Sequence, residues 1–186
     1  INRGSKLAGR LGAKRFVPFL EETLARIEFE QGNEIEAEQL AEAALRKVRD
    51  MGLDTFIGPW VMSTVALTTL NPARRVEILE EGEALLAKGC VGHNYFRFYR
   101  NAMQACLNAE AFDEAERLST ALETYTSAEP TPWSQYHIQR TRALANKARG
   151  NPDNDALTKL RTTAEAASLF NAMPVIRKKQ YQTAVT

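Results

Sequence analysis

Residues 24–45 read LARIEFEQGNEIEAEQLAEAAL, and this stretch decides the fold because it joins two amphipathic segments through one tight turn. Apolar residues recur in it at intervals of three and four, the spacing that places them on one face of a helix. Gly32 and Asn33 separate the two segments, and a glycine followed by a polar residue ends one helix and begins the next. The stretch therefore predicts two antiparallel helices joined by a short loop.

The same organisation continues along the rest of the chain, where alternating, strand-like patterns are nearly absent. Asn71-Pro72 and Thr131-Pro132 predict helix starts, because the first residue caps a helix and proline fits its first position. Gly52 predicts a helix end, since glycine enters the left-handed conformation at little cost. We predict about eight helices, over residues 16–31, 34–51, 55–70, 72–88, 95–109, 113–127, 133–149 and 154–171.

Helices joined by short loops in pairs of about 35 to 45 residues predict a repeat protein. A pair of that length cannot bury its apolar face alone, so each pair must stack on the next. We expect one all-α domain over residues 1–186, a right-handed superhelix of about four antiparallel helix pairs, with a basic N-terminal start and a C-terminal tail. The pairs are predicted at residues 13–52, 55–89, 94–128 and 131–171.

The first pair resembles a tetratricopeptide repeat in the places of its small residues. The residues that match the offsets of this repeat are Leu24, Ala25, Gly32, Ala37, Ala41 and Ala44. Small side chains at these offsets let paired helices approach closely. Residues 105–118, ACLNAEAFDEAERL, keep part of the pattern but have Glu110 where glycine is usual. The resemblance implies a degenerate, tetratricopeptide-like fold.

Residues 89–145 show a narrower resemblance, to the C-terminal helical repeats of large bacterial proteins. Those proteins carry a class III adenylate/guanylate cyclase domain, then a P-loop ATPase domain, then the repeats. The resemblance implies that this chain is a fragment whose parent is a nucleotidyl cyclase, with the chemistry upstream of Ile1. The chain itself has no phosphate-binding loop of the form G-x-x-x-x-G-K-[ST], and no functional residue of those domains can be placed on it.

Residues 89–100, GCVGHNYFRFYR, concentrate the residue types that perform chemistry. The only cysteines and histidines of the chain are Cys90, His93, Cys106 and His137, which are numerically enough for a tetrahedral zinc site. Cys106 nevertheless falls in an apolar helical series, where a free cysteine acts as a small hydrophobic residue. We therefore expect ordinary packing, with no catalytic residue, metal or cofactor in this chain.

The same stretch divides into a turn and a helix. Asn94 is predicted to cap a helix from Tyr95, and Phe96 and Tyr99 are expected to pack inward. Arginines and aromatic residues interleave here and again in residues 133–142, which belong to the first helix of the next pair. First helices of adjacent pairs are expected to line one concave wall. The candidate partner groove consists of Tyr95, Arg97, Arg100, Trp133, Tyr136 and Arg140.

Charge and hydropathy restrict the partners. The chain has 24 Lys and Arg against 23 Asp and Glu, so its net charge of +1 provides no general attraction for nucleic acid or an anionic membrane. No apolar run approaches the length of about 18 residues that a membrane span needs, so we expect a cytoplasmic location and no membrane contact. The expected occupant of the groove is a peptide or a protein domain, including upstream domains of the same polypeptide.

Three alternatives stay open at this point. One is a repeat module from an ATPase-type transcriptional regulator, which shares the same domain order without the cyclase. Another is an RNA-binding helical repeat, because arginines beside aromatic rings can hold single strands. The third is a homodimer, in which the basic start and the acidic stretch from Glu21 to Glu42 would orient two copies.

Overall fold

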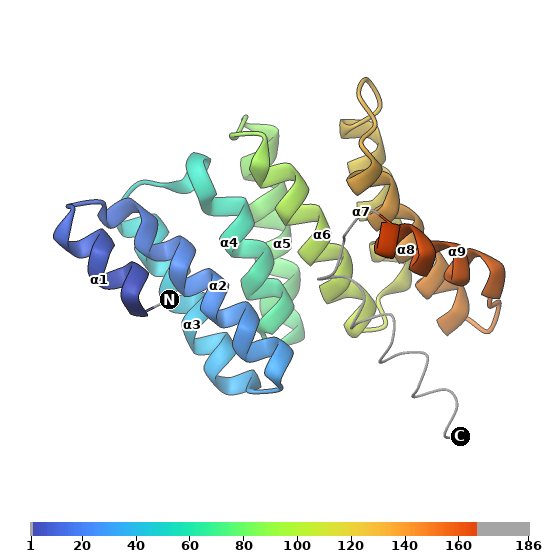
Figure 1. Cartoon of the computed structure of the whole chain (residues 1–186), viewed down its shortest axis with the longest axis horizontal. Coiled ribbons are helices and arrows are strands. Elements are labelled where there is room, and N and C mark those ends of the chain that lie inside the picture. Colours follow the sequence, from blue (N-terminus) through green and yellow to red (C-terminus); the bar gives the residue numbers. More distant parts are fainter. Residues whose placement is uncertain (1, 167–186) are drawn as a thin grey trace. The chain divides into compact units, whose positions relative to one another are not determined.

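A computed structural model of the chain describes residues 2–166 (Figure 1). Within these residues every regular element is helical and no strand occurs. The elements are α1 (Asn2–Arg10), the 3-10 helix η1 (Lys14–Phe16), α2 (Val17–Gln31), α3 (Glu34–Asp50), α4 (Asp54–Thr68), α5 (Pro72–Ala87), α6 (His93–Asn108), α7 (Phe112–Tyr125), α8 (Pro132–Ala148) and α9 (Asn154–Ala166). The predicted all-α fold class, with helices packed against one another, is confirmed.

The predicted helices are all present in the described residues, and one α-helix and the short η1 were missed. Helix α1 lies in the basic N-terminal start, where few apolar residues mark a periodic face. It ends at Arg10, and in the turn that follows Gly12 has a left-handed φ of 65° and the Ala13 N–H donates to the Ala8 carbonyl at 2.8 Å. The end of the helix predicted over 154–171, and the C-terminal tail, lie outside the described residues.

The chain forms two compact units, Ile1–Ala111 and Phe112–Thr186. Helices α1 to α6 belong to the first, which we call unit 1, and α7 to α9 belong to unit 2. The boundary falls inside the pair predicted over 94–128, so one helix of that pair lies in each unit.

In unit 1 the first helices of successive pairs are neighbours. Helix α2 packs on α3 and α4, and α4 packs on α5 and α6. Four of the small residues predicted to allow close approach, Ala25, Ala37, Ala41 and Ala44, are fully buried, whereas Gly32 lies in the exposed turn between α2 and α3. Their burial explains the sequence pattern, because an alanine at a helix crossing brings the backbones together without a cavity.

A close helix contact in unit 1 joins Gly82 of α5 to Phe98 of α6. Phe98 is 0% exposed, and a Cβ atom placed on Gly82 would lie 2.3 Å from its ring atom Cε2. Phe96, which was expected to pack inward, is half-buried, whereas Phe98 fills the core. Tyr99 is buried as predicted. The helical spacing of apolar residues did not predict the burial of Phe98, because α6 buries residues on more than one of its sides.

Unit 2 is a smaller stack in which α8 packs on both α7 and α9. The predicted cap at Thr131 is present, with the Ser134 N–H donating to Thr131 Oγ1 at 3.1 Å. Leu118 and Leu122 of α7 are fully buried. None of the helices in the described part of the chain is long and apolar enough to cross a membrane.

Candidate functional site

Helix α4 contains a proline in its interior, and this defect organises the helix beside it. Pro59 has no N–H, so the carbonyl of Thr55 cannot receive the usual hydrogen bond from four residues ahead. The Val91 N–H donates to that carbonyl instead, at 3.3 Å. The segment before α6 is thereby attached to the first turn of α4.

Asn94 strengthens the same junction. Its Nδ2 donates to the carbonyls of Phe56 at 2.9 Å and Val91 at 3.1 Å, and its Oδ1 accepts the Trp60 N–H at 3.3 Å. The prediction that Asn94 caps the helix was wrong, because α6 begins at His93 and Asn94 is fully buried within its first turn. The amide is used to join two helices, a role that only the tertiary structure reveals.

The cysteines and histidines of the candidate zinc set have local roles. His93 Nε2 lies 2.9 Å from the Phe56 carbonyl, to which it donates when the proton is on that nitrogen. Cys90 Sγ donates to the Leu85 carbonyl at 3.3 Å, and burial raises the pKa of its thiol. Cys106 is buried in α6. Within the described residues, no three His, Cys, Asp or Glu side chains gather where they could hold a metal ion.

Aromatic rings connect the first helices of unit 1. The Phe19 ring of α2 contacts the Trp60 ring of α4 edge-on, with centroids 4.8 Å apart. The His93 ring of α6 lies 5.8 Å from the rings of both Phe56 and Trp60. Edge-to-face contacts of this kind add to the burial of the rings. Helices α2, α4 and α6 are therefore held together as one surface.

A chain of hydrogen bonds crosses the same three helices. Arg100 donates through Nε and Nη2 to Asn101 Oδ1, at 3.1 and 2.9 Å. The Asn101 amide donates to the hydroxyls of Ser63 at 3.2 Å and Thr64 at 3.1 Å. Thr64 in turn donates to the carboxylate of Glu22 at 2.8 Å. Glu22 is only 1% exposed, so this carboxylate is a buried charge beneath the surface.

We name the surface above this network the arginine face and define it by Arg26 of α2, Trp60 of α4, and Arg97 and Arg100 of α6. The Arg97 guanidinium lies over the Trp60 ring, 4.9 Å from its centroid. Arg26 is 3.6 Å from the exposed carboxylate of Glu30. Among the described residues, neither Arg97 nor Arg100 forms an ion pair with a carboxylate. These two arginines are half-buried.

The charges of the arginine face are poorly neutralised. Burial, Arg26 and Arg97 together lower the pKa of Arg100 to about 9, against an opposing effect of Glu22. Burial and Arg26 also lower the pKa of Arg97. Among the described residues, Glu22 and Glu30 are the carboxylates that oppose this charge, so three arginines face two carboxylates. The arrangement can accept an anion, because Arg97 lies over a neutral ring and Arg100 donates to a neutral amide, and both charged groups are partly removed from water.

The six residues predicted to form a groove have different surroundings. Arg97 and Arg100 belong to the arginine face, whereas the Tyr95 hydroxyl donates to the Leu86 carbonyl of α5 at 2.7 Å. The remaining three, Trp133, Tyr136 and Arg140, lie in α8 of unit 2. The prediction that all six line one groove stays a prediction.

The three predicted groove residues in α8 are wholly or partly buried in unit 2. The Trp133 ring packs 4.2 Å from the His137 ring, while Tyr136 and Arg140 are 2% and 5% exposed. Burial lowers the pKa of Arg140 to about 10 and raises that of Tyr136. In unit 2 the predicted groove residues are therefore largely buried.

Sequence reasoning missed Arg26, Trp60 and Glu22. The sequence did contain a signal for Glu22 and Arg26. They are four residues apart on the first helix of the first pair, a spacing that places them on one face, and Arg97 and Arg100 are similarly three apart on α6. The missing information was which first helices are neighbours. That choice depends on the aromatic contacts and hydrogen bonds between helices.

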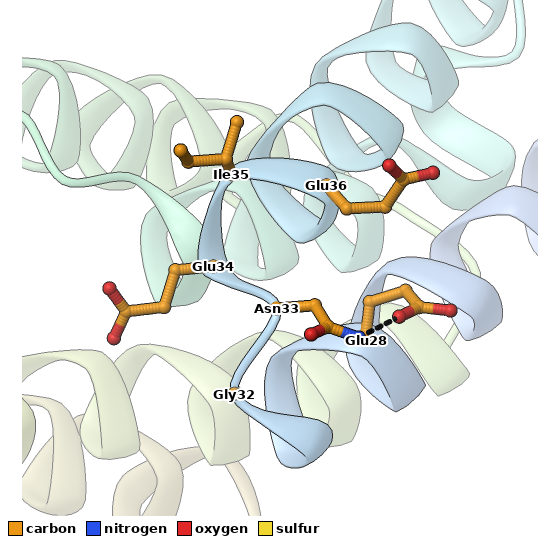
Figure 2. A pocket seen from close by; sticks show the side chains of 6 residues that line it. All are labelled: Glu28, Gly32, Asn33, Glu34, Ile35 and Glu36. Carbon is orange, nitrogen blue, oxygen red and sulfur yellow. Dashed lines mark hydrogen bonds between the residues drawn. The ribbon is translucent and has the colours of Figure 1, made fainter.

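A shallow hollow lies at the turn between α2 and α3 (Figure 2). Its lining is acidic and consists of Glu28, Gly32, Asn33, Glu34, Ile35 and Glu36. Within it the Asn33 amide donates to the Glu28 carboxylate at 2.7 Å, a bond that Figure 2 shows. Apart from that bond its polar side chains are open to solvent, so the hollow is a solvated turn.

Comparison with protein-family models, with curated proteins and with solved structures finds no match to this chain.

Proposed function

We propose that the chain is a non-catalytic interaction module that binds a peptide or a protein domain on the first helices of its repeats. The observation that carries the proposal is the arginine face of unit 1. Helices α2, α4 and α6 are fixed to one another there by ring contacts and hydrogen bonds. A surface that is already ordered loses little conformational entropy on binding, which favours recognition.

The unpaired charges support binding over a purely structural role. Burying a charged group without a partner costs stability, and apolar residues of similar size would pack at least as well. Arg97 and Arg100 are held in defined orientations by Trp60 and Asn101, which are neutral. Arginines that are oriented without being neutralised are suited to an external anionic group.

The cyclase connection is part of the same proposal and comes from the sequence resemblance. In that setting the module would bind a partner and transmit the binding to the catalytic end of the parent protein. The reading frame upstream of Ile1 tests this point. Cyclase motifs there would support it, whereas a helix-turn-helix would favour the transcriptional regulator.

The RNA-binding alternative has less support from the arginine face. A base must stack on an exposed ring, but one face of Trp60 is covered by Arg97 and its ring contacts Phe19 and His93. The charge excess of this face is also small. We therefore treat RNA as an outcome of the experiments below.

A displayed library of random peptides tests the interaction function without a known partner. Enriched peptides would be synthesised and titrated against the chain, Arg97→Gln, and the matched control Arg46→Gln, an exposed arginine of α3. We expect enriched peptides to lose affinity for Arg97→Gln and to keep it for Arg46→Gln. Failure to enrich any peptide, or equal loss in both variants, would contradict the proposal.

A further inference from the structure

The arginine face has a charge excess that one carboxylate would neutralise. Arg26, Arg97 and Arg100 oppose Glu22 and Glu30, which leaves one uncompensated positive charge. Glu22 is buried directly under the network and is not available to turn outward, because Thr64 holds its carboxylate. The charge that completes the set must therefore come from outside unit 1.

The N–H donors of Arg97 and Arg100 that have no acceptor within the described residues indicate the shape of the anionic group that would bind this face. Arg100 uses its Nε and Nη2 edge on Asn101, so its Nη1 end has no partner among the described residues. Arg97 lies over the Trp60 ring, which leaves its N–H groups in the guanidinium plane for an acceptor. The two arginines are one turn apart on α6 and share a side of the helix. A planar acceptor with two oxygens matches two such guanidinium groups.

We propose that the arginine face binds an acidic segment of a partner protein, with one Asp or Glu carboxylate held between Arg97 and Arg100. This inference rests on the proposed interaction function and specifies the chemistry of the partner. A carboxylate carries a single charge, which equals the excess on the face. A phosphate carries about two at neutral pH, and the second charge would lie close to Glu22 without a cation to oppose it.

Trp60 borders the proposed carboxylate site with both its apolar ring and its polar indole N–H. Its indole N–H is buried and has no acceptor in the described structure. The ring also fixes Arg97, so an acidic side chain would meet a preformed guanidinium beside an aromatic edge. Preorganised donors of this kind contribute to selectivity for the correct anion.

The test uses four pools of acetylated octapeptides that differ at the fourth position only. The first pool has Asp or Glu there, the second Asn or Gln, and the third phosphoserine, all with amidated C-termini. The fourth is neutral at that position and has a free C-terminal carboxylate. Binding is followed by the Nε–H signals of Arg97 and Arg100 in ¹⁵N NMR spectra, with the signal of exposed Arg46 as an internal control.

We expect the Asp or Glu pool to shift the signals of Arg97 and Arg100 and to leave Arg46 unchanged. The Asn or Gln pool should have little effect. Substituting either arginine by glutamine should weaken binding of the acidic pool at least about tenfold, the usual effect of losing a charge-assisted hydrogen bond. Arg46→Gln serves as the matched control, and circular dichroism of each variant verifies folding.

Several results would overturn the inference. Equal shifts with the acidic and the amide pools would show that the face does not distinguish a charged from a neutral side chain. Stronger binding of the phosphoserine pool or of the free-carboxylate pool would show that the face prefers that group to an acidic side chain. A salt-sensitive shift with a single-stranded RNA oligonucleotide alone would assign the face to nucleic acid. If the acidic pool fails while library-selected peptides still depend on Arg97, the interaction function survives and only this assignment falls.

Self-association provides a second measurement on the same variants. Glu34, Ile35 and Glu36 form an exposed acidic turn, with Ile35 68% exposed, and a second copy could present it to the arginine face. Light scattering should find a monomer at the concentrations used for binding. A dimer that dissociates in the Glu34→Gln, Glu36→Gln double variant would make the second copy the occupant and overturn the inference of a separate partner.

Discussion

The side-chain amide of Asn94 donates a 2.9 Å hydrogen bond to the backbone carbonyl of Phe56, and this bond connects α6 to the part of α4 that Pro59 interrupts. Replacing Asn94 by alanine leaves this carbonyl and the Trp60 N–H with fewer partners in a buried place. We expect the free energy of unfolding to fall by about 2 to 4 kcal/mol, because each buried polar group left unpaired costs about 1 to 3 kcal/mol. Urea denaturation of the variant measures the loss.

The control for this prediction is Asn108→Ala, which removes an exposed asparagine at the end of the same helix. That variant should stay within about 0.5 kcal/mol of the wild type, as surface substitutions usually do. Similar losses in both variants would show that the Asn94 junction has no special role.

The contact of Gly82 with Phe98 predicts a substitution with a specific rescue. Gly82→Ala places a methyl group 2.3 Å from the ring, so the helices must separate or the ring must move. We expect a loss of about 1 to 3 kcal/mol, typical of overpacking. Phe98→Leu in the same chain should recover part of it, and a double-mutant cycle by chemical denaturation measures the coupling. Additive effects of the two substitutions would contradict the contact.

The arginine face predicts opposite stability effects for a buried acid and a half-buried base. Glu22→Gln removes a charge that opposes Arg97 and Arg100, so we expect a loss of about 1 to 3 kcal/mol. Arg100→Gln removes a poorly neutralised charge and keeps a donor for Asn101, so we expect unchanged or increased stability. Thermal unfolding of both variants decides, and a strong loss for Arg100→Gln would mean that its charge is already paired.

We predict that the thiol of Cys90 is alkylated slowly. Burial raises the pKa of its thiol, so at pH 8 a smaller fraction is thiolate than in a free cysteine. In the Cys106→Ala background, iodoacetamide should modify Cys90 more slowly than it modifies glutathione, and the rate should still rise above pH 9. Alkylation of Cys90 at the rate of glutathione or faster would contradict the environment described for it.

The helices could be predicted because their signals are local. Asn71 and Thr131 cap their helices as the sequence indicated, and the buried alanines of the first pair occupy the positions that the repeat pattern marked. These features depend on residues three or four apart in the chain. Periodicity and capping chemistry therefore suffice to find them.

The site could be predicted only in part because its residues come together through tertiary contacts. Arg97 and Arg100 were identified from their interleaving with aromatic residues, but their neighbours Arg26 and Trp60 are distant in sequence. Asn94 has the residue type of a helix cap and serves instead to join two helices across the gap created by Pro59. The spacing of residues in the sequence does not indicate that Asn94 pairs with the backbone of α4.

The indole N–H signal of Trp60 provides the most direct measurement of the central claim, that α2, α4 and α6 present the binding surface. The chain has two tryptophans, so Trp133→Phe leaves one indole signal to follow. On titration with a library-selected peptide, we predict that this signal and the Arg97 Nε–H signal shift together with the same dissociation constant, while Arg46 on α3 does not move. Saturating binding that shifts Arg46 and leaves Trp60 and Arg97 unchanged would contradict the account.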